Sequence, residues 1–144
     1  MKINAWIRYF IYFVLISVIV FVGEKIFIYM KGNTDFILVN SIVLQNILRV
    51  LLFGSIGAVL GVEHLINESR KRGPWRINIP HLIFLVLPSL YFSLAYIIYY
   101  SDFVPVILTR PISFLMLSGV GYIVIFQVIF GYLAVTSFYK PQRD

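Results

Sequence analysis

The sequence predicts an all-α membrane protein, a bundle of four transmembrane helices with both termini on one side. Its composition is the first reason, because 60% of the 144 residues are hydrophobic and only 12% are charged. A soluble domain carries about 25% charged residues to keep its surface wet. Four long apolar segments and the placement of the basic residues are the other reasons. Soluble, disordered and fibrous classes are therefore excluded.

The four apolar segments are each long enough to cross a bilayer, which takes about 20 helical residues. Their continuous hydrophobicity lacks the alternation of a membrane β-barrel strand, so helices are favoured. We expect one integral membrane domain over residues 1–144, with spans near 5–29, 41–64, 79–100 and 111–138.

Three prolines bear on these spans. Pro80 and Pro111 fall near the predicted starts of the third and fourth spans, where a missing backbone N–H costs little. Pro88 falls inside the third span, where proline removes a helical hydrogen bond. We therefore expect a third helix that is kinked at Pro88.

The basic residues orient the chain. If four spans alternate, eight of the twelve Lys and Arg residues fall on one side, and three fall on the other. An excess of Lys and Arg marks the cytoplasmic side, so both termini are expected there, in a bacterial cytoplasmic membrane. The majority are Lys2, Arg8, Arg70, Lys71, Arg72, Arg76, Lys140 and Arg143, and the minority are Lys25, Lys31 and Arg110.

The remaining basic residue, Arg49, lies within the second span with Gln45 and Asn46 on the same helical sector. A membrane-embedded Arg costs about 2.5–3.5 kcal/mol and usually faces protein or water. Either Arg49 is buried with a functional role, or it snorkels to the outer interface. A third alternative places residues 35–48 in an interfacial segment before the true span.

A buried Arg49 needs an acidic partner at the same depth. Glu24, near the outer end of the first span, is the best candidate, followed by Asp102 and Asp35.

Small residues indicate where helices pack. Gly54, Gly57 and Gly61 form a stripe on the second span, and Gln127 and Gly131 form a similar line on the fourth. Such stripes let helix backbones approach closely in lipid, either within the bundle or between two copies.

Two polar groups lie at the predicted inner face. The first group, Glu63, His64 and His81, invites a metal or general-base interpretation. Its spacing matches no known ligand pattern, and the chain has no cysteine. We therefore expect neither a metal nor a cofactor. The basic loop that follows is expected to contact anionic lipid headgroups or an acidic partner. Its residues are Arg70, Lys71, Arg72, Trp75 and Arg76.

These observations favour an accessory or assembly protein over an enzyme. Little of the chain lies outside the bilayer, so we expect it to act through helix packing, as a homo-oligomer or as a subunit of a larger membrane complex, with no nucleic-acid partner. The alternative is a small transporter or channel with a polar path around Arg49. A lipid-acting enzyme that uses Glu63, His64 and the basic loop is a third possibility.

The predicted topology has a direct test. A reporter that is active only in the cytoplasm, fused after Asp144, should be active, because the excess of basic residues retains both termini there. The same reporter inserted after Asn33 should be inactive. Activity at the inserted position alone would overturn the orientation.

Overall fold

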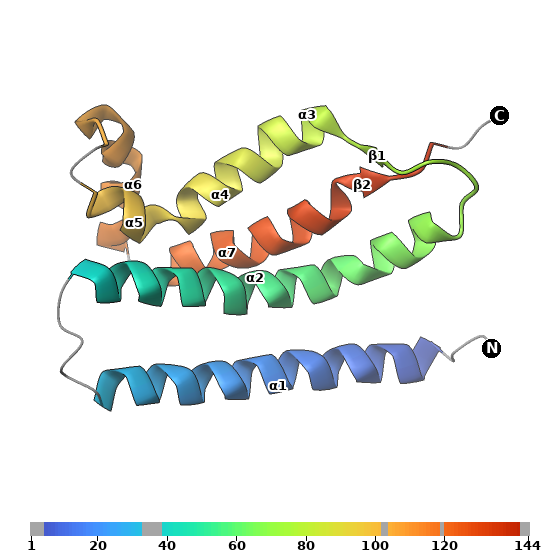
Figure 1. Ribbon diagram of the computed structural model, residues 1–144, viewed down its shortest axis with the longest axis horizontal. Coiled ribbons are helices and arrows are strands. Elements are labelled where there is room, and N and C mark those ends of the chain that lie inside the picture. Colours follow the sequence, from blue (N-terminus) through green and yellow to red (C-terminus); the bar gives the residue numbers. More distant parts are fainter. Residues whose placement is uncertain (1–4, 33–38, 102–103, 119, 142–144) are drawn as a thin grey trace.

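The computed structural model describes residues 5–32, 39–101, 104–118 and 120–141. The described chain is mostly helical, and its helices lie roughly side by side along one long axis (Figure 1). By length and hydrophobicity, two of the described helices are able to cross a membrane, and a bent pair makes a third candidate. The predicted class, a helical protein with membrane-spanning segments, agrees with this architecture.

The first two helices are long and uninterrupted. Helix α1 covers Ala5–Gly32 and helix α2 covers Val39–Ser69. Both contain a stretch that is long and apolar enough to span a bilayer, Trp6–Tyr29 and Val43–Ser69. Because α2 is continuous from Val39, Arg49 lies inside one long helix and does not follow a separate interfacial segment.

The centre of the fold is the contact between α2 and α7 (Val120–Thr136), which run alongside each other (Figure 1). Their backbones touch at glycines. A Cβ atom on Gly57 would lie 1.9 Å from the Val128 carbonyl oxygen, and one on Gly131 would lie 1.9 Å from the Gly54 carbonyl oxygen. Only glycine permits this separation, so these residues set the distance between the two helices.

The third apolar segment is interrupted. It consists of α3 (Ile79–His81), the π-helical turn η2 (Leu82–Val86), α4 (Leu87–Ser93) and α5 (Ala95–Tyr99). Pro80 lies at the start of α3, as predicted, and Asn78 caps that helix by accepting a hydrogen bond from the His81 N–H. The sequence places one disturbance at Pro88, whereas the structure has a π-helical turn just before it and a second break at Leu94.

The break at Leu94 has a backbone cause. Leu94 adopts φ −91° and ψ 15°, outside the α-helical region, so α4 ends there and α5 starts in a new direction. Pro88 is accommodated at the first turn of α4, where its missing N–H costs little. The amide of the preceding residue, Leu87, closes the π-helical turn by donating to the Leu82 carbonyl.

The expected fourth span over 111–138 falls on two helices in the structure. Helix α6 (Val106–Ser118) begins before Pro111, which lies inside it, and the axes of 106–117 and 121–136 differ by 114°. The bend has a packing reason, because Ile112 of α6 is fully buried against Ala95 and Ile123. This contact folds α6 back onto α5 and the start of α7.

A short antiparallel ladder closes the opposite end of the molecule. Strand β1 (Arg76–Ile77) pairs with β2 (Phe138–Tyr139), with Arg76 opposite Tyr139. The first turn of α1, the last turn of α2 and both strands lie at this same end (Figure 1). Gly73, in the loop after α2, has φ +145°, a conformation that favours glycine.

Adding a methyl group at the α2–α7 contact should destabilise the fold. For Gly131→Ala and Gly57→Ala we expect a loss of about 1–3 kcal/mol, because the new Cβ overlaps backbone that cannot move independently. The measurement is the unfolding free energy in mild detergent. Gly121→Ala is the matched control, since nothing lies within 4 Å of its Cβ. Equal stability of all three variants would contradict the contact.

Candidate functional site

Arg49 is the one basic residue that the predicted topology assigns to neither side of the membrane. Its half-buried side chain lies between two aromatic rings, with Cζ 5.6 Å from the Phe27 ring centroid and 5.4 Å from the Tyr96 ring centroid. Phe27 belongs to α1 and Tyr96 to α5. Aromatic faces attract a guanidinium electrostatically, and more strongly where water is scarce. Arg49 therefore connects α1 to α5 across α2.

The expected acidic partner of Arg49 is not in contact with it. Glu24 is exposed and forms no ion pair with any described residue. The two other candidates, Asp35 and Asp102, lie outside the described residues. Within the described chain, the Arg49 guanidinium therefore faces aromatic rings, which attract it without neutralising its charge, and it pairs with no carboxylate.

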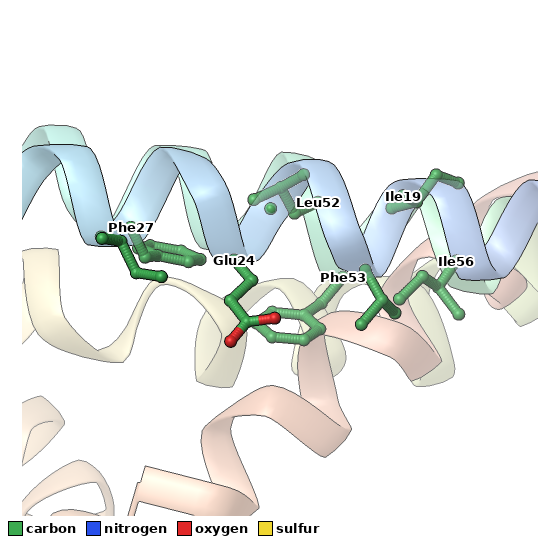
Figure 2. Close-up of a pocket in the computed structure, with 9 residues that line it drawn as sticks. Ile19, Glu24, Phe27, Leu52, Phe53 and Ile56 are labelled. Atoms are coloured by element: carbon green, nitrogen blue, oxygen red, sulfur yellow. The ribbon is translucent and has the colours of Figure 1, made fainter.

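Glu24 instead lines a cavity between α1 and α2. The cavity has a volume of about 430 Å³, and Glu24 is its only charged lining residue. Figure 2 shows the Glu24 carboxylate projecting from α1 on the same side as the Phe53 ring. The other residues around the cavity are Ile19, Val20, Gly23, Phe27, Ile28, Leu52 and Ile56.

An ion pair joins the first turn of α1 to the C-terminal part of α2. The Arg8 guanidinium lies 2.8 Å from a Glu63 carboxylate oxygen, and the Tyr9 hydroxyl donates to the same oxygen at 3.4 Å. A partly exposed ion pair of this kind contributes about 0–1 kcal/mol to the free energy of folding in water. Helix α1 is thus attached to its neighbours by an arginine toward each end, Arg8 and Arg49, with the cavity between them.

A second polar group lies in the interior of the bundle. Asn46 of α2 and Gln127 of α7, both almost fully buried, donate to the Ser93 carbonyl oxygen at 3.5 Å and 3.3 Å. This carbonyl belongs to the last residue of α4, just before the break at Leu94. Two side-chain amides therefore supply donors to a carbonyl at a helix end.

The predicted polar sector of α2, which consists of Gln45, Asn46 and Arg49, is therefore divided among different surroundings. Asn46 points into the interior, while Arg49 lies between aromatic rings and Gln45 is half-buried. Polar side chains three or four residues apart on one helix have different neighbours here, because α1, α4 and α5 meet α2 from different directions. Within the described chain, Asn46 and Arg49 therefore contact different helices.

The glycine stripes also have their partners within the chain. Gly54, Gly57 and Gly131 lie in the α2–α7 contact described above, and a Cβ on Gly61 would meet the Val135 side chain at 2.9 Å. Gln127 is fully buried in the same contact. These residues therefore pack α2 against α7 and are not available to a second copy.

The basic loop is anchored to the C-terminal segment. Glu68 is buried and accepts from the Lys71 ammonium at 2.5 Å and from the Lys140 backbone N–H at 2.8 Å. The Lys140 ammonium nitrogen (Nζ) donates to the Ser69 carbonyl oxygen at 3.1 Å and lies 4.8 Å from the Trp75 ring centroid. The remaining cations of the loop, Arg70, Arg72 and Arg76, are exposed.

Both histidines contact the same C-terminal segment. His64 Nε2 lies 3.2 Å from the Phe138 carbonyl oxygen, and His81 Nδ1 lies 3.1 Å from the Ser137 hydroxyl. In the described ranges, no group of three His, Cys, Asp or Glu side chains is arranged to hold a metal ion. The two histidines are positioned to attach α2 and α3 to the strand that follows α7.

Comparisons with known proteins give no relative from which a function could be transferred. No protein family model, curated protein or solved structure matches this chain.

Several residues of these sites were not singled out from the sequence. Tyr96 and Phe27 carry no sequence signal that separates them from other aromatic residues of the spans. Ser93 belongs to the interior polar group through its backbone carbonyl, which no side-chain pattern in the sequence signals. The Arg8–Glu63 pair does have a signal, since both residues fall at the predicted inner ends of adjacent spans.

The aromatic environment of Arg49 predicts a measurable coupling. Arg49→Gln and Tyr96→Leu should each destabilise the chain, and the double variant should be about 0.5–1 kcal/mol more stable than the sum of the two losses predicts. The measurement is a double-mutant cycle on the unfolding free energy in detergent. Glu24→Gln combined with Arg49→Gln is the control and should be additive. Coupling only in the Glu24 cycle would instead support the ion pair.

Proposed function

We propose that this chain is a small integral membrane protein that acts through helix contacts, as an accessory or assembly subunit or as a homo-oligomer. In this proposal four segments enter the membrane as a bundle, the third is kinked at Pro88, and both termini face the cytoplasm of a bacterial cell. The packing of α1 carries the functional part of the proposal.

Helix α1 is less enclosed than α2, the other long helix of the described fold. In its most apolar 18-residue stretch, only 6% of the residues are buried inside the chain, compared with 17% for α2. Its contacts with the rest of the chain run mainly along α2, at the loose interface that contains the cavity. A helix attached on one side only is the natural place for a second protein to pack.

One face of α1 is rich in aromatic side chains. We define the aromatic stripe as Trp6, Phe10, Phe13 and Phe21, which recur at helical spacing and are 84%, 65%, 67% and 68% exposed. Large aromatic side chains dominate the energetics of many protein contacts. Because the glycine faces of α2 and α7 are already used within the chain, the aromatic stripe is the surface on which the assembly proposal now depends.

The inner face supports a lipid contact in the same proposal. Arg70, Arg72 and Arg76 are exposed around Trp75, whose ring is 48% exposed. Each basic residue near an anionic membrane surface gains about 1 kcal/mol. We propose that these side chains contact anionic headgroups of the cytoplasmic leaflet. The transporter alternative has no comparable support, since the Arg49 guanidinium lies over the Phe27 and Tyr96 rings.

Crosslinking through introduced cysteines tests the assembly proposal cleanly, because the chain has no cysteine of its own. Single cysteines at Phe10, Phe13 or Phe21 should give disulfide-linked dimers in native membranes if the partner is a second copy. They should give a mixed adduct with a heterobifunctional crosslinker if the partner is another protein.

The control is Phe84→Cys, which places a cysteine at a 75% exposed position outside α1. It should give few crosslinks, because only random collisions in the bilayer would form them. Crosslinking that is equal at Phe84 and at the three stripe positions would contradict the proposal. A strict monomer with no adduct at any position would do the same.

A further inference from the structure

The cavity between α1 and α2 combines an apolar wall with one carboxylate. We propose that it binds a lipophilic cation, a molecule in which an ammonium or phosphonium centre carries apolar groups, and that Glu24 is the counter-ion. This inference is independent of the assembly proposal, which concerns the aromatic stripe of α1.

The size and lining of the cavity suit a small molecule. Ligand sites are clefts of about 300–1,000 Å³ that are mostly apolar, with a few polar groups that fix the orientation of the ligand. This cavity is within that range at about 430 Å³, and eight of its nine lining residues are apolar. The wall on α2 is formed by Leu52, Phe53 and Ile56, and the wall on α1 includes Ile19 and Phe27.

Gly23 brings the two walls together at one side of the cavity. Its buried position faces Leu52, and a Cβ added there would lie 3.1 Å from the Leu52 Cδ1 atom. The helices are therefore in contact beside the cavity but separate around it. The space is a feature of the helix interface and is bounded by side chains from both helices (Figure 2).

The negative charge of Glu24 indicates that the ligand carries a positive charge. Glu24 lies five residues before Tyr29, the end of the apolar stretch of α1, which is about 7.5 Å along the helix axis. A carboxylate inside an apolar environment is costly unless it is paired. Glu24 has no ion-pair partner in the described chain, and neither Lys25 nor Arg49 lines the cavity. A bound cation would supply the missing charge.

Aromatic rings strengthen the preference for a cation. Phe53 and Phe27 both line the cavity, and a cation near the face of a ring is attracted by its quadrupole. Phe27 already faces the Arg49 guanidinium, so Phe53 is the ring that a bound cation would contact. A neutral acyl chain would fill the apolar space but leave the carboxylate unpaired, and an anion would be repelled. The observations therefore favour a cation with apolar substituents.

The test uses two probes of matched shape and opposite charge, tetraphenylphosphonium and tetraphenylborate. The full chain is reconstituted in nanodiscs of phosphatidylcholine, and empty nanodiscs give the background of partitioning into lipid. We expect saturable binding of tetraphenylphosphonium above that background and no saturable binding of tetraphenylborate.

Three variants locate the site. Glu24→Gln should weaken binding of the cation by a factor on the order of ten or more, since it removes the counter-ion. Ile56→Phe should weaken it as well, by filling the cavity while leaving the carboxylate in place. Leu51→Phe is the matched control for Ile56→Phe, because it adds the same bulk to an exposed position of α2 that does not line the cavity, and it should bind as the unchanged chain does.

Two results would overturn the proposal. One is binding of the cation that is unaffected by Glu24→Gln and Ile56→Phe, in samples whose helical content and size match those of the unchanged chain. The other is saturable binding of the anion with equal strength. Neither result bears on the crosslinking of the aromatic stripe, so the two proposals fail separately.

Discussion

The arrangement of the described helices depends on the direct contact between the backbones of α2 and α7. In lipid, apolar side chains gain little by leaving the solvent, so helices associate through close packing and hydrogen bonds. Gly57 and Gly131 allow the two backbones to touch, and a methyl group at either position would overlap a carbonyl oxygen of the opposite helix. This contact also brings Gln127 next to Asn46, so that both amides reach the Ser93 carbonyl.

Helix α1 is attached by a different kind of interaction. It has no glycine contact as close as that of α2 with α7, and its attachment relies on the Arg8–Glu63 ion pair and on Arg49 against Phe27. Interactions toward the two ends leave the middle of the interface loosely packed, and the cavity with Glu24 lies there. The aromatic stripe is exposed along the same loosely packed helix. The proposed assembly surface and the proposed ligand site thus have one structural origin.

The end of the molecule that carries β1 and β2 is fixed by polar contacts around the C-terminal segment. Glu68, His64 and His81 all contact residues between Ser137 and Lys140, and β1 pairs with β2 beside them. A histidine pair with nearby carboxylates suggests chemistry when only the sequence is read. In the fold, hydrogen bonds to the chain itself account for these side chains.

The sequence by itself determined the class of the protein, because hydrophobicity accumulates over 20-residue segments and needs no knowledge of their neighbours. It also identified the residues that matter most, Arg49, Glu24 and the glycines, since each is unusual in an apolar segment. Only the tertiary structure decided their partners. The turn back at α6 depends on Ile112 reaching Ala95, and the two rings around Arg49 come from helices that are distant in sequence. Such contacts depend on how helices cross and rotate, which the periodicity of one segment does not specify.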